Sequence, residues 1–200
     1  ILFMAFKRLR YLSIATGIVA ILSVQEILET IEQKRQSMQA IYSLRNSTGL
    51  AVFKGEHAIV LVDSALSQNQ NNYTFNVQPH LWQQGIQTPK FVLLDKSING
   101  GLSGLTLADG NQLLVVDGKR WLILSNTPQM QPTGSFFVDY ILLRNNARLK
   151  PQDLQVYTFD KVILDGSNSF WYRERMRQEF EKAGIAFHDV MESGAFVVGE

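Results

Sequence analysis

The sequence predicts an α/β protein: a sandwich of β-rich layers with outer helices, preceded by a transmembrane helix. Three observations lead to this prediction. A charge-free apolar run lies near the N-terminus, short apolar runs separated by turn residues follow from about residue 40, and strand and helix patterns alternate beyond residue 134. We therefore expect residues 1–35 to form the membrane helix and a stalk, and residues 36–200 to form the folded domain.

Composition limits the classes of protein to which this chain can belong. Its 200 residues, 46% of them hydrophobic, suffice for one domain with a real core and an additional element. The absence of cysteine excludes a disulfide framework, a thiolate zinc site and a cysteine nucleophile. Lys and Arg number 19 against 18 Asp and Glu, so any contact with nucleic acid must depend on a local patch of positive charge.

The first element that we expect is a membrane helix. Residues 11–25 carry no charge and are apolar nearly all round, which is close to the length of about 17 to 25 residues that a spanning helix needs. Lys7, Arg8 and Arg10 precede this run, so the positive-inside rule predicts a cytoplasmic N-terminal side and a periplasmic domain. The apolar residues 1–6 would then be the end of a preceding span.

Two other interpretations of this segment stay open. A cleavable signal peptide needs a small-residue cleavage site, of which Ser23-Val24-Gln25 is a poor version. A soluble amphipathic helix would show an apolar stripe, which residues 11–24 lack. Residues 26–35 continue as a polar helix, which we expect to form a stalk between the membrane and the folded domain.

The next part of the chain has the pattern of short strands. We expect them at residues 40–44, 49–54, 58–62, 73–77, 91–94, 112–116 and 120–124. Lys54-Gly55-Glu56 and Asp117-Gly118-Lys119 lie between such runs, and Asp-Gly is a strong hairpin signal. Antiparallel meanders are therefore predicted, with the polar residues 69–72 and the glycine-rich residues 97–104 as loops.

The C-terminal part alternates strands with helices. We expect strands at residues 137–143, 161–165 and 187–190, and a short helix from Pro151. The last helix has N-cap candidates at Ser167, Asn168 and Ser169, and Gly184 can end it. One face of this helix is apolar at helical spacing, at Tyr172, Met176, Phe180 and Ala183. A strand, a crossover helix and a further strand form a βαβ-like unit.

Histidine and glycine patterns give little support to a catalytic site. His57, His80 and His188 are scattered without the short spacing of metal ligands, which argues against a zinc hydrolase. His188 and Asp189 are neighbours in a predicted strand, so their side chains should point to opposite faces, and we favour a structural histidine. Residues 100–104 lack the Lys-Ser/Thr ending of a phosphate loop and are expected to form a turn.

Aspartates at strand ends are the other candidates. Asp63, Asp95, Asp139 and Asp165 each lie at or near the end of an apolar strand. Open sheets often carry functional side chains at such positions, but aspartates there also simply cap turns. Carboxylates alone can still recruit Mg²⁺ or Mn²⁺, so both interpretations remain open.

Basic and aromatic residues offer possible contacts to DNA. Arg173 and Arg177 lie on the last helix, where glutamates interleave with the basic residues, so a solvated mixed-charge face is the favoured interpretation. Trp82, Trp121 and Trp171 could stack on bases, but tryptophans in β-rich domains usually pack in the core or at its rim, and we prefer packing.

Three stretches carry a resemblance to a known family. They are residues 162–169 (VILDGSNS), residues 187–198 (FHDVMESGAFVV) after the helix that ends at Gly184-Ile185, and residues 59–64 (IVLVDS). Together with the order of a membrane span, a β-rich part and an α/β part, these stretches resemble the C-terminal region of ComEC/Rec2 competence proteins, particularly those like the Bacteroidetes versions. The resemblance implies a metallo-β-lactamase-like domain, with Asp63 at the end of its first motif.

The resemblance also implies that the metal site of this domain is degenerate. Active members have a strand that runs into an H-x-H-x-D-H loop, whereas here strand residues 139–143 run into Arg144-Asn145-Asn146 and residues 147–150. None of these residues can replace the histidines, and arginine brings positive charge where a cation would lie. Asp63, Asp139, Asp165, Asn168, His188 and Asp189 remain the candidate site residues. No cofactor is expected, although Mg²⁺ or Mn²⁺ is not excluded.

The family implies transport of single-stranded DNA across the bacterial inner membrane, together with other competence proteins. We expect the soluble domain to act non-catalytically at the DNA entrance. One alternative is a metal-dependent nuclease or hydrolase with an atypical carboxylate site. Another is a membrane-anchored interaction module unrelated to competence.

Overall fold

The computed structural model describes residues 9–35, 37–94, 102–129 and 136–199. The chain divides into two compact units, residues 1–36 and 37–200. Each unit is described by itself below.

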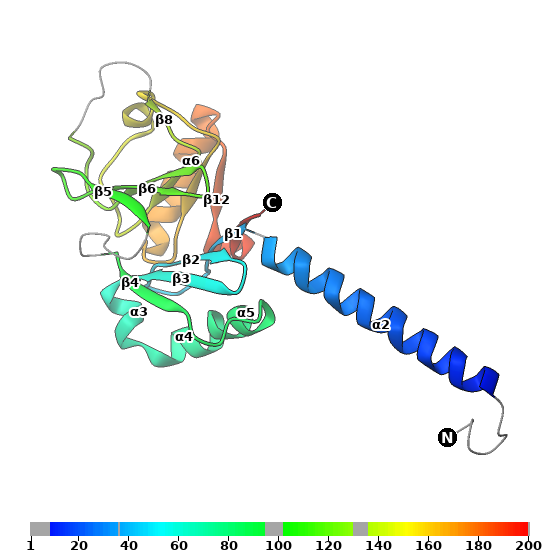
Figure 1. Ribbon diagram of the computed structural model, residues 1–200. Coiled ribbons are helices and arrows are strands. Elements are labelled where there is room, and N and C mark those ends of the chain that lie inside the picture. Colours follow the sequence, from blue (N-terminus) through cyan, green and yellow to red (C-terminus); the bar gives the residue numbers. More distant parts are fainter. Residues whose placement is uncertain (1–8, 36, 95–101, 130–135, 200) are drawn as a thin grey trace. The chain divides into compact units, whose positions relative to one another are not determined.

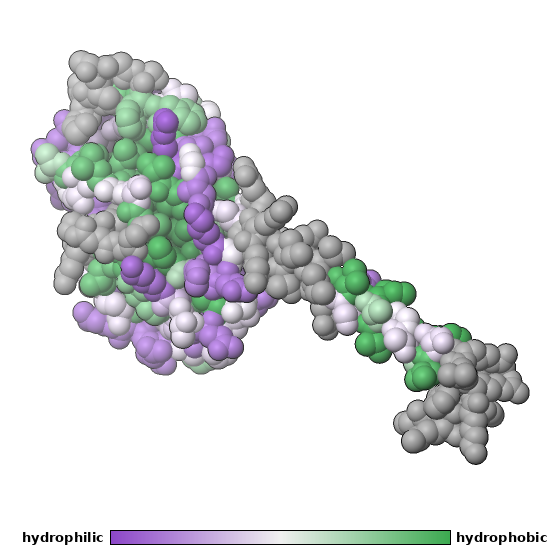
Figure 2. Space-filling view, in the orientation of Figure 1, coloured by the Kyte–Doolittle hydropathy of each residue, from purple (hydrophilic) through white to green (hydrophobic). Residues whose placement is uncertain are grey.

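The first unit contains one long helix, α2 (Leu9–Arg35). This confirms the expected helical continuation through residues 26–35. Large apolar side chains are exposed along its middle, at Leu12, Ile14, Ile18, Val19, Ile21, Leu22 and Val24 (Figure 2). Within the residues that the structure describes, no helix combines the length and the apolar character that crossing a membrane requires. The expected transmembrane helix is therefore not confirmed, and residues 1–6, expected to end a preceding span, lie outside the described residues.

The second unit is built on two mixed β-sheets. The first has the order β13-β1-β2-β3-β4, with β13 (Phe196–Gly199), β1 (Ser37–Ile41), β2 (Gly49–Lys54), β3 (His57–Val62) and β4 (Lys90–Leu93). The second has the order β12-β11-β9-β7-β6-β5, with β12 (Phe187–Asp189), β11 (Lys161–Leu164), β9 (Tyr140–Leu143), β7 (Lys119–Leu124), β6 (Gln112–Val116) and β5 (Ser103–Thr106). Two short strands, β8 (Phe136–Phe137) and β10 (Tyr157–Thr158), pair separately.

Helices cover the outer faces of both sheets. α3 (Ser64–Gln68), α4 (Gln70–Asn76) and α5 (Gln78–Gln83) lie together beside the first sheet (Figure 1). The second sheet is covered by α6 (Phe170–Ala183) and the 3₁₀ helix η1 (Pro151–Leu154). The short helix α7 (Val190–Ser193) follows β12. This arrangement makes four layers, helix, sheet, sheet and helix, and confirms the α/β class and the β-rich layers with outer helices.

Successive side chains of a strand point to opposite faces of its sheet, and this divides the apolar side chains among three cores. On β3, Leu61 belongs to the core between the sheets, while Val60 and Val62 face α3 and α5. On β9, Leu142 faces the first sheet, and its neighbour Leu143 packs toward α6. The parallel strands at the centre are therefore apolar at nearly every position, because both of their faces are buried.

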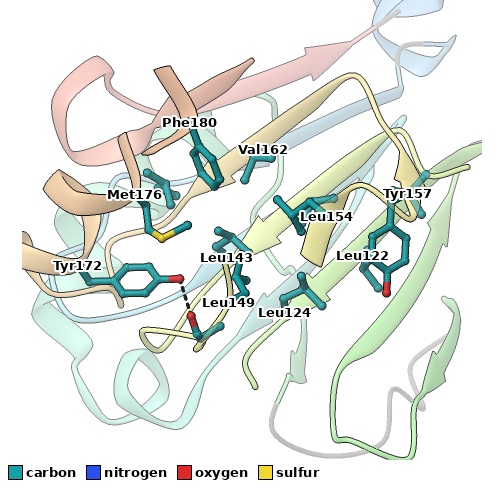
Figure 3. Packing of buried hydrophobic residues seen from close by; sticks show 14 residues of the cluster. Leu122, Leu124, Leu143, Leu149, Leu154, Tyr157, Val162, Tyr172, Met176 and Phe180 are labelled. Atoms are coloured by element: carbon teal, nitrogen blue, oxygen red, sulfur yellow. Dashed lines mark hydrogen bonds between the residues drawn. The ribbon is translucent and has the colours of Figure 1, made fainter. Parts of the chain in front are cut away.

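The C-terminal strand–helix–strand segment agrees best with what the sequence predicts. β11 and β12 are parallel and are joined by α6, as the βαβ-like pattern predicts. Ser169 caps α6 through its hydroxyl, and Gly184 ends the helix in the left-handed conformation at φ 66°. Tyr172, Met176 and Phe180 point from α6 toward the sheet (Figure 3). The predicted hairpin at Asp117-Gly118 joins β6 to β7, with both residues at positive φ.

Several predicted elements were wrong. Residues 73–77 are not a strand, because Tyr73 to Asn76 belong to α4, and residues 70–72, expected in a loop, begin that helix. Tertiary packing overrides the strand propensity of this segment, since Leu66, Val77 and Leu81 must cover the first sheet. The meander is also interrupted, because β4 pairs with β3 in parallel. Residues 103–106 form β5, and residues 137–143 split into β8 and β9.

Candidate functional site

Charged side chains gather where three strands end. Asp63 directly follows β3, Arg144 follows β9, and Asp165 follows β11. β9 and β11 are parallel neighbours in one sheet, so their carboxyl ends lie together. Thr48, from the loop between β1 and β2, completes the group, which we call the strand-end cluster: Thr48, Asp63, Arg144 and Asp165. All four residues are buried.

Asp63 has a structural and an electrostatic role in this cluster. It is the N-cap of α3, and its Oδ1 accepts a hydrogen bond from the Leu66 amide at 2.7 Å. Its Oδ2 accepts one from the Thr48 amide at 2.8 Å. The same oxygen lies 3.7 Å from Nη2 of Arg144, and the two side chains are only 6% and 3% exposed. The carboxylate therefore links a helix N-terminus, a loop and a buried cation.

Asp165 is completely buried, and three neighbouring side chains donate hydrogen bonds to it. The Thr48 hydroxyl donates to Oδ2, while Oδ1 accepts from the Ser167 hydroxyl at 2.6 Å and from Asn168 Nδ2 at 3.0 Å. Burial raises the pKa of Asp165 from 3.8 to about 6, because desolvation of the carboxylate outweighs these hydrogen bonds and the positive charge of Arg144.

Arg144 supplies the positive charge of the strand-end cluster. It is 2% exposed, ion-paired with Asp63 and coupled electrostatically to Asp165. Across the described ranges, no three His, Cys, Asp or Glu side chains come close enough together to hold a metal ion. The cation beside the two carboxylates is a guanidinium from the chain itself, which can neither move a proton at neutral pH nor activate water.

The Asn168 side chain joins the loops around the strand-end cluster through hydrogen bonds. Its Nδ2 donates to the Leu143 carbonyl at 2.7 Å, and its Oδ1 accepts from the Asn146 amide at 2.8 Å. Asn146 returns a bond, because its Oδ1 accepts from the Ser169 amide at 2.8 Å. The loop between β1 and β2 is attached to the same group, because the Asn46 amide donates a hydrogen bond to the Gly166 carbonyl. Asn46 and Asn146 adopt positive φ, a conformation that asparagine tolerates well.

Asp139 lies apart from this group. It precedes β9, at the opposite end of the strand from Arg144. Its Oδ2 accepts from the Arg120 amide at 2.8 Å, and Lys119 Nζ lies 3.6 Å from Oδ1. Asp95, the other strand-end aspartate, lies outside the described residues.

His188 and Asp189 make separate contacts. His188 Nε2 is 2.9 Å from the Gly194 carbonyl oxygen. Asp189 is buried, caps α7, and receives two hydrogen bonds of 2.8 Å from Arg173 Nη1. Arg177 is ion-paired with glutamates of α6 and α7. A DNA contact of Arg173 or Arg177 stays a prediction, and both guanidinium groups already have partners within the domain.

Sequence reasoning missed Thr48 and Ser167 as members or neighbours of the cluster. Both are short polar residues in loops, and no spacing rule distinguishes them from ordinary turn residues. The one usable signal was Gly166, directly after Asp165. A side chain at Gly166 would meet the Leu44 carbonyl oxygen at 1.8 Å, so the loop that holds Thr48 approaches this glycine closely.

Comparisons with known proteins give one match. A family model described as the ComEC C-terminal domain matches residues 39–200. No curated protein and no solved structure matches the chain. The likeness to Bacteroidetes versions and the degenerate metallo-β-lactamase site are not tested by this match and stay predictions. The chain belongs to the ComEC C-terminal domain family, which links it to competence and DNA uptake.

Proposed function

We propose that this chain is part of a competence DNA-uptake protein and that its folded unit acts without catalysis at the DNA entrance of the channel. The observation that carries the proposal is the buried Arg144–Asp63 ion pair in the strand-end cluster. A metallo-β-lactamase-like nuclease would need its metal ions at this position. In this chain the position is taken by a fixed positive charge.

The charge of Arg144 opposes metal binding. A divalent cation bound by Asp63 or Asp165 would lie close to the guanidinium. At about 4 Å the repulsion amounts to roughly 8 kcal/mol at an effective dielectric constant of 20. Both carboxylates already accept hydrogen bonds, Asp63 from two backbone amides and Asp165 from three side chains, and a metal ion would have to displace these donors.

The layer order supports the inferred relation to metallo-β-lactamases. Two sheets pack face to face with helices outside, and Asp63 ends the strand of the expected first motif. We infer that the loop after β9 corresponds to the histidine-rich loop; here the Asn146 amide and side chain bind the neighbouring loop at Asn168 and Ser169. We infer a lactamase-like scaffold whose former metal loop is now structural.

Membrane attachment through α2 is the second part of the proposal. Apolar side chains from Leu12 to Val24 are exposed on this helix, which basic residues precede in the sequence. Association of this helix with the inner membrane would cover these side chains.

Cleavage of DNA is the reaction that tests the non-catalytic proposal. The full chain, kept in mild detergent, is incubated with labelled single-stranded and double-stranded DNA in the presence of Mn²⁺, Mg²⁺ or Zn²⁺. We expect no cleavage above the metal-free level. The alternative, a nuclease built on carboxylates, requires metal-dependent cleavage that Asp165→Asn abolishes and Asp139→Asn preserves, because Asp139 lies at the other end of β9.

A further inference from the structure

Two large aromatic side chains are exposed at the beginning of α6. Trp171 is 79% exposed and Phe170 is 60% exposed, and their rings contact each other edge to face with centroids 5.3 Å apart. The sequence had suggested that tryptophans pack in the core or at its rim. That holds for Trp121, which is buried and donates to Gln39, but not for Trp171. An exposed aromatic pair of this size needs a partner to cover it.

Three loops are hydrogen-bonded to one another and to residues that flank the aromatic pair. The Ser169 amide binds Asn146, the Asn145 amide donates to Ser167 Oγ at 2.9 Å, and Tyr172 Oη donates to the Ala147 carbonyl at 2.7 Å (dashed in Figure 3). The loop of residues 44–48 is attached to the same segment through the Gly166 carbonyl. The loops of residues 44–48, 144–150 and 166–169 therefore adjoin one another beside the start of α6.

The surface of these loops and of the start of α6 carries positive charge and hydrogen-bonding groups. We define the loop-end surface as six of its exposed residues: Arg45, Asn145, Asn146, Arg148, Phe170 and Trp171. The three loops contain no Asp or Glu, and the adjacent Asp63 and Asp165 are buried. Glu174, one turn further along α6, is paired with Arg177. The chain as a whole has a net charge of only +1, so the charge is concentrated locally.

We propose that the loop-end surface binds single-stranded nucleic acid, with bases stacked on Trp171 and Phe170 and phosphates paired with Arg45 and Arg148. Aromatic platforms beside arginines are the usual means of holding a strand without reading its sequence. This inference rests on the proposed function, which supplies DNA as the source. Two loops of the loop-end surface follow the carboxyl ends of β9 and β11, beside the strand-end cluster.

Fluorescence of Trp171 tests the proposal. The full chain carrying Trp82→Phe is reconstituted in phosphatidylcholine vesicles, which leaves Trp171 as the exposed tryptophan beside the buried Trp121. Oligothymidylate should quench the emission. Oligouridylate is the second arm, and equal or tighter binding of the DNA strand supports the proposal, whereas binding of RNA alone contradicts it. A blue shift with phosphatidylglycerol vesicles, without any response to oligonucleotide, would assign the surface to the membrane instead.

Variants separate stacking from charge. Trp171→Ala should weaken oligothymidylate binding roughly tenfold, and Trp171→Phe should retain most of it, because phenylalanine still stacks. Trp82→Ala, which removes an exposed tryptophan elsewhere, is the matched control. Arg148→Glu should weaken binding and reduce its salt dependence, while Lys182→Glu, at the far end of α6, should do so much less.

Melting temperatures of all variants show whether each one folds. Unchanged affinity in folded Trp171→Ala would overturn the inference. Absence of oligonucleotide binding by the unsubstituted chain would do the same, while leaving the non-catalytic proposal, which depends on the cleavage assay, in place.

Discussion

The Nη2 atom of Arg144 lies 3.7 Å from the Oδ2 atom of Asp63, and water reaches neither side chain to any extent. The pair joins the carboxyl ends of β9 and β3, strands of two different sheets. Removing one member of a buried pair leaves the other charge without compensation, which costs far more than the net stabilisation that the intact pair provides.

Arg144→Met should therefore lower the free energy of unfolding by about 3 to 5 kcal/mol at neutral pH. Urea denaturation followed by circular dichroism measures the change. Arg148→Met, an exposed arginine of the same loop, is the control and should stay within about 0.5 kcal/mol of the unsubstituted chain. Equal stability of both variants would show that the buried pair contributes nothing.

The raised pKa of Asp165 predicts a specific dependence of the free energy of unfolding on pH. Its pKa in the folded protein, about 6, exceeds the ordinary 3.8, so the folded state binds the proton more tightly than the unfolded state does. The contribution of this group is therefore greatest below about pH 4 and is lost as the pH rises through about 6, by roughly 3 kcal/mol at most.

Asp165→Asn should remove that dependence. The free energy of unfolding of both proteins is measured between about pH 4 and pH 7, and their difference isolates this carboxyl from all others. The unsubstituted chain should lose stability relative to the variant as the pH rises. Parallel curves for the two proteins would mean that Asp165 titrates normally.

Gly166→Ala should strongly destabilise the folded unit. The added methyl carbon would lie 1.8 Å from the Leu44 carbonyl oxygen, a backbone atom that cannot rotate away. We expect a loss of more than about 4 kcal/mol or failure to fold. Thermal melting followed by circular dichroism measures the loss. Gly199→Ala, where the nearest atom is 3.7 Å away, is the control and should hardly change the melting temperature. A Gly166→Ala protein that melts normally would show that the two loops are not in contact.

Arg173→Met tests whether the basic face of α6 is structural. The guanidinium makes two hydrogen bonds to the buried Asp189, so its loss should cost about 3 kcal/mol of stability. Arg175→Met, two residues further along α6 and more than half exposed, is the control and should change stability little. If Arg173→Met weakened binding to DNA while leaving stability unchanged, the direct DNA contact suggested by the sequence would be correct.

The sequence predicted those elements whose signals are local. Cap residues, apolar spacing and the Asp117-Gly118 turn define α6 and the β6–β7 hairpin, and both were found as expected. The strand prediction for residues 73–77 failed because Tyr, Thr, Phe and Val favour strands, whereas the fold requires a helix here to cover the first sheet. No residue pattern within that segment indicates that a helix must cover the sheet.

The strand-end cluster was predictable only in part. Asp63 and Asp165 could be selected because each follows an apolar strand, and the positive charge of Arg144 in the loop after β9 was apparent. Asp139 shared the same local pattern but lies at the opposite end of its strand, since the apolar run is divided between β8 and β9. Which strand ends lie together depends on the order of strands in the sheets, and that order is a long-range property.

Metal binding is the most direct test of the central claim, that Arg144 has replaced the cation of a lactamase-like site. The full chain is titrated with Mn²⁺ and with Zn²⁺ in a calorimeter, beside its Asp165→Asn variant. We expect only weak, non-saturating heats that are the same for both proteins. A saturating isotherm that the Asp165→Asn substitution abolishes would show that the strand-end cluster holds a metal, and would contradict the account.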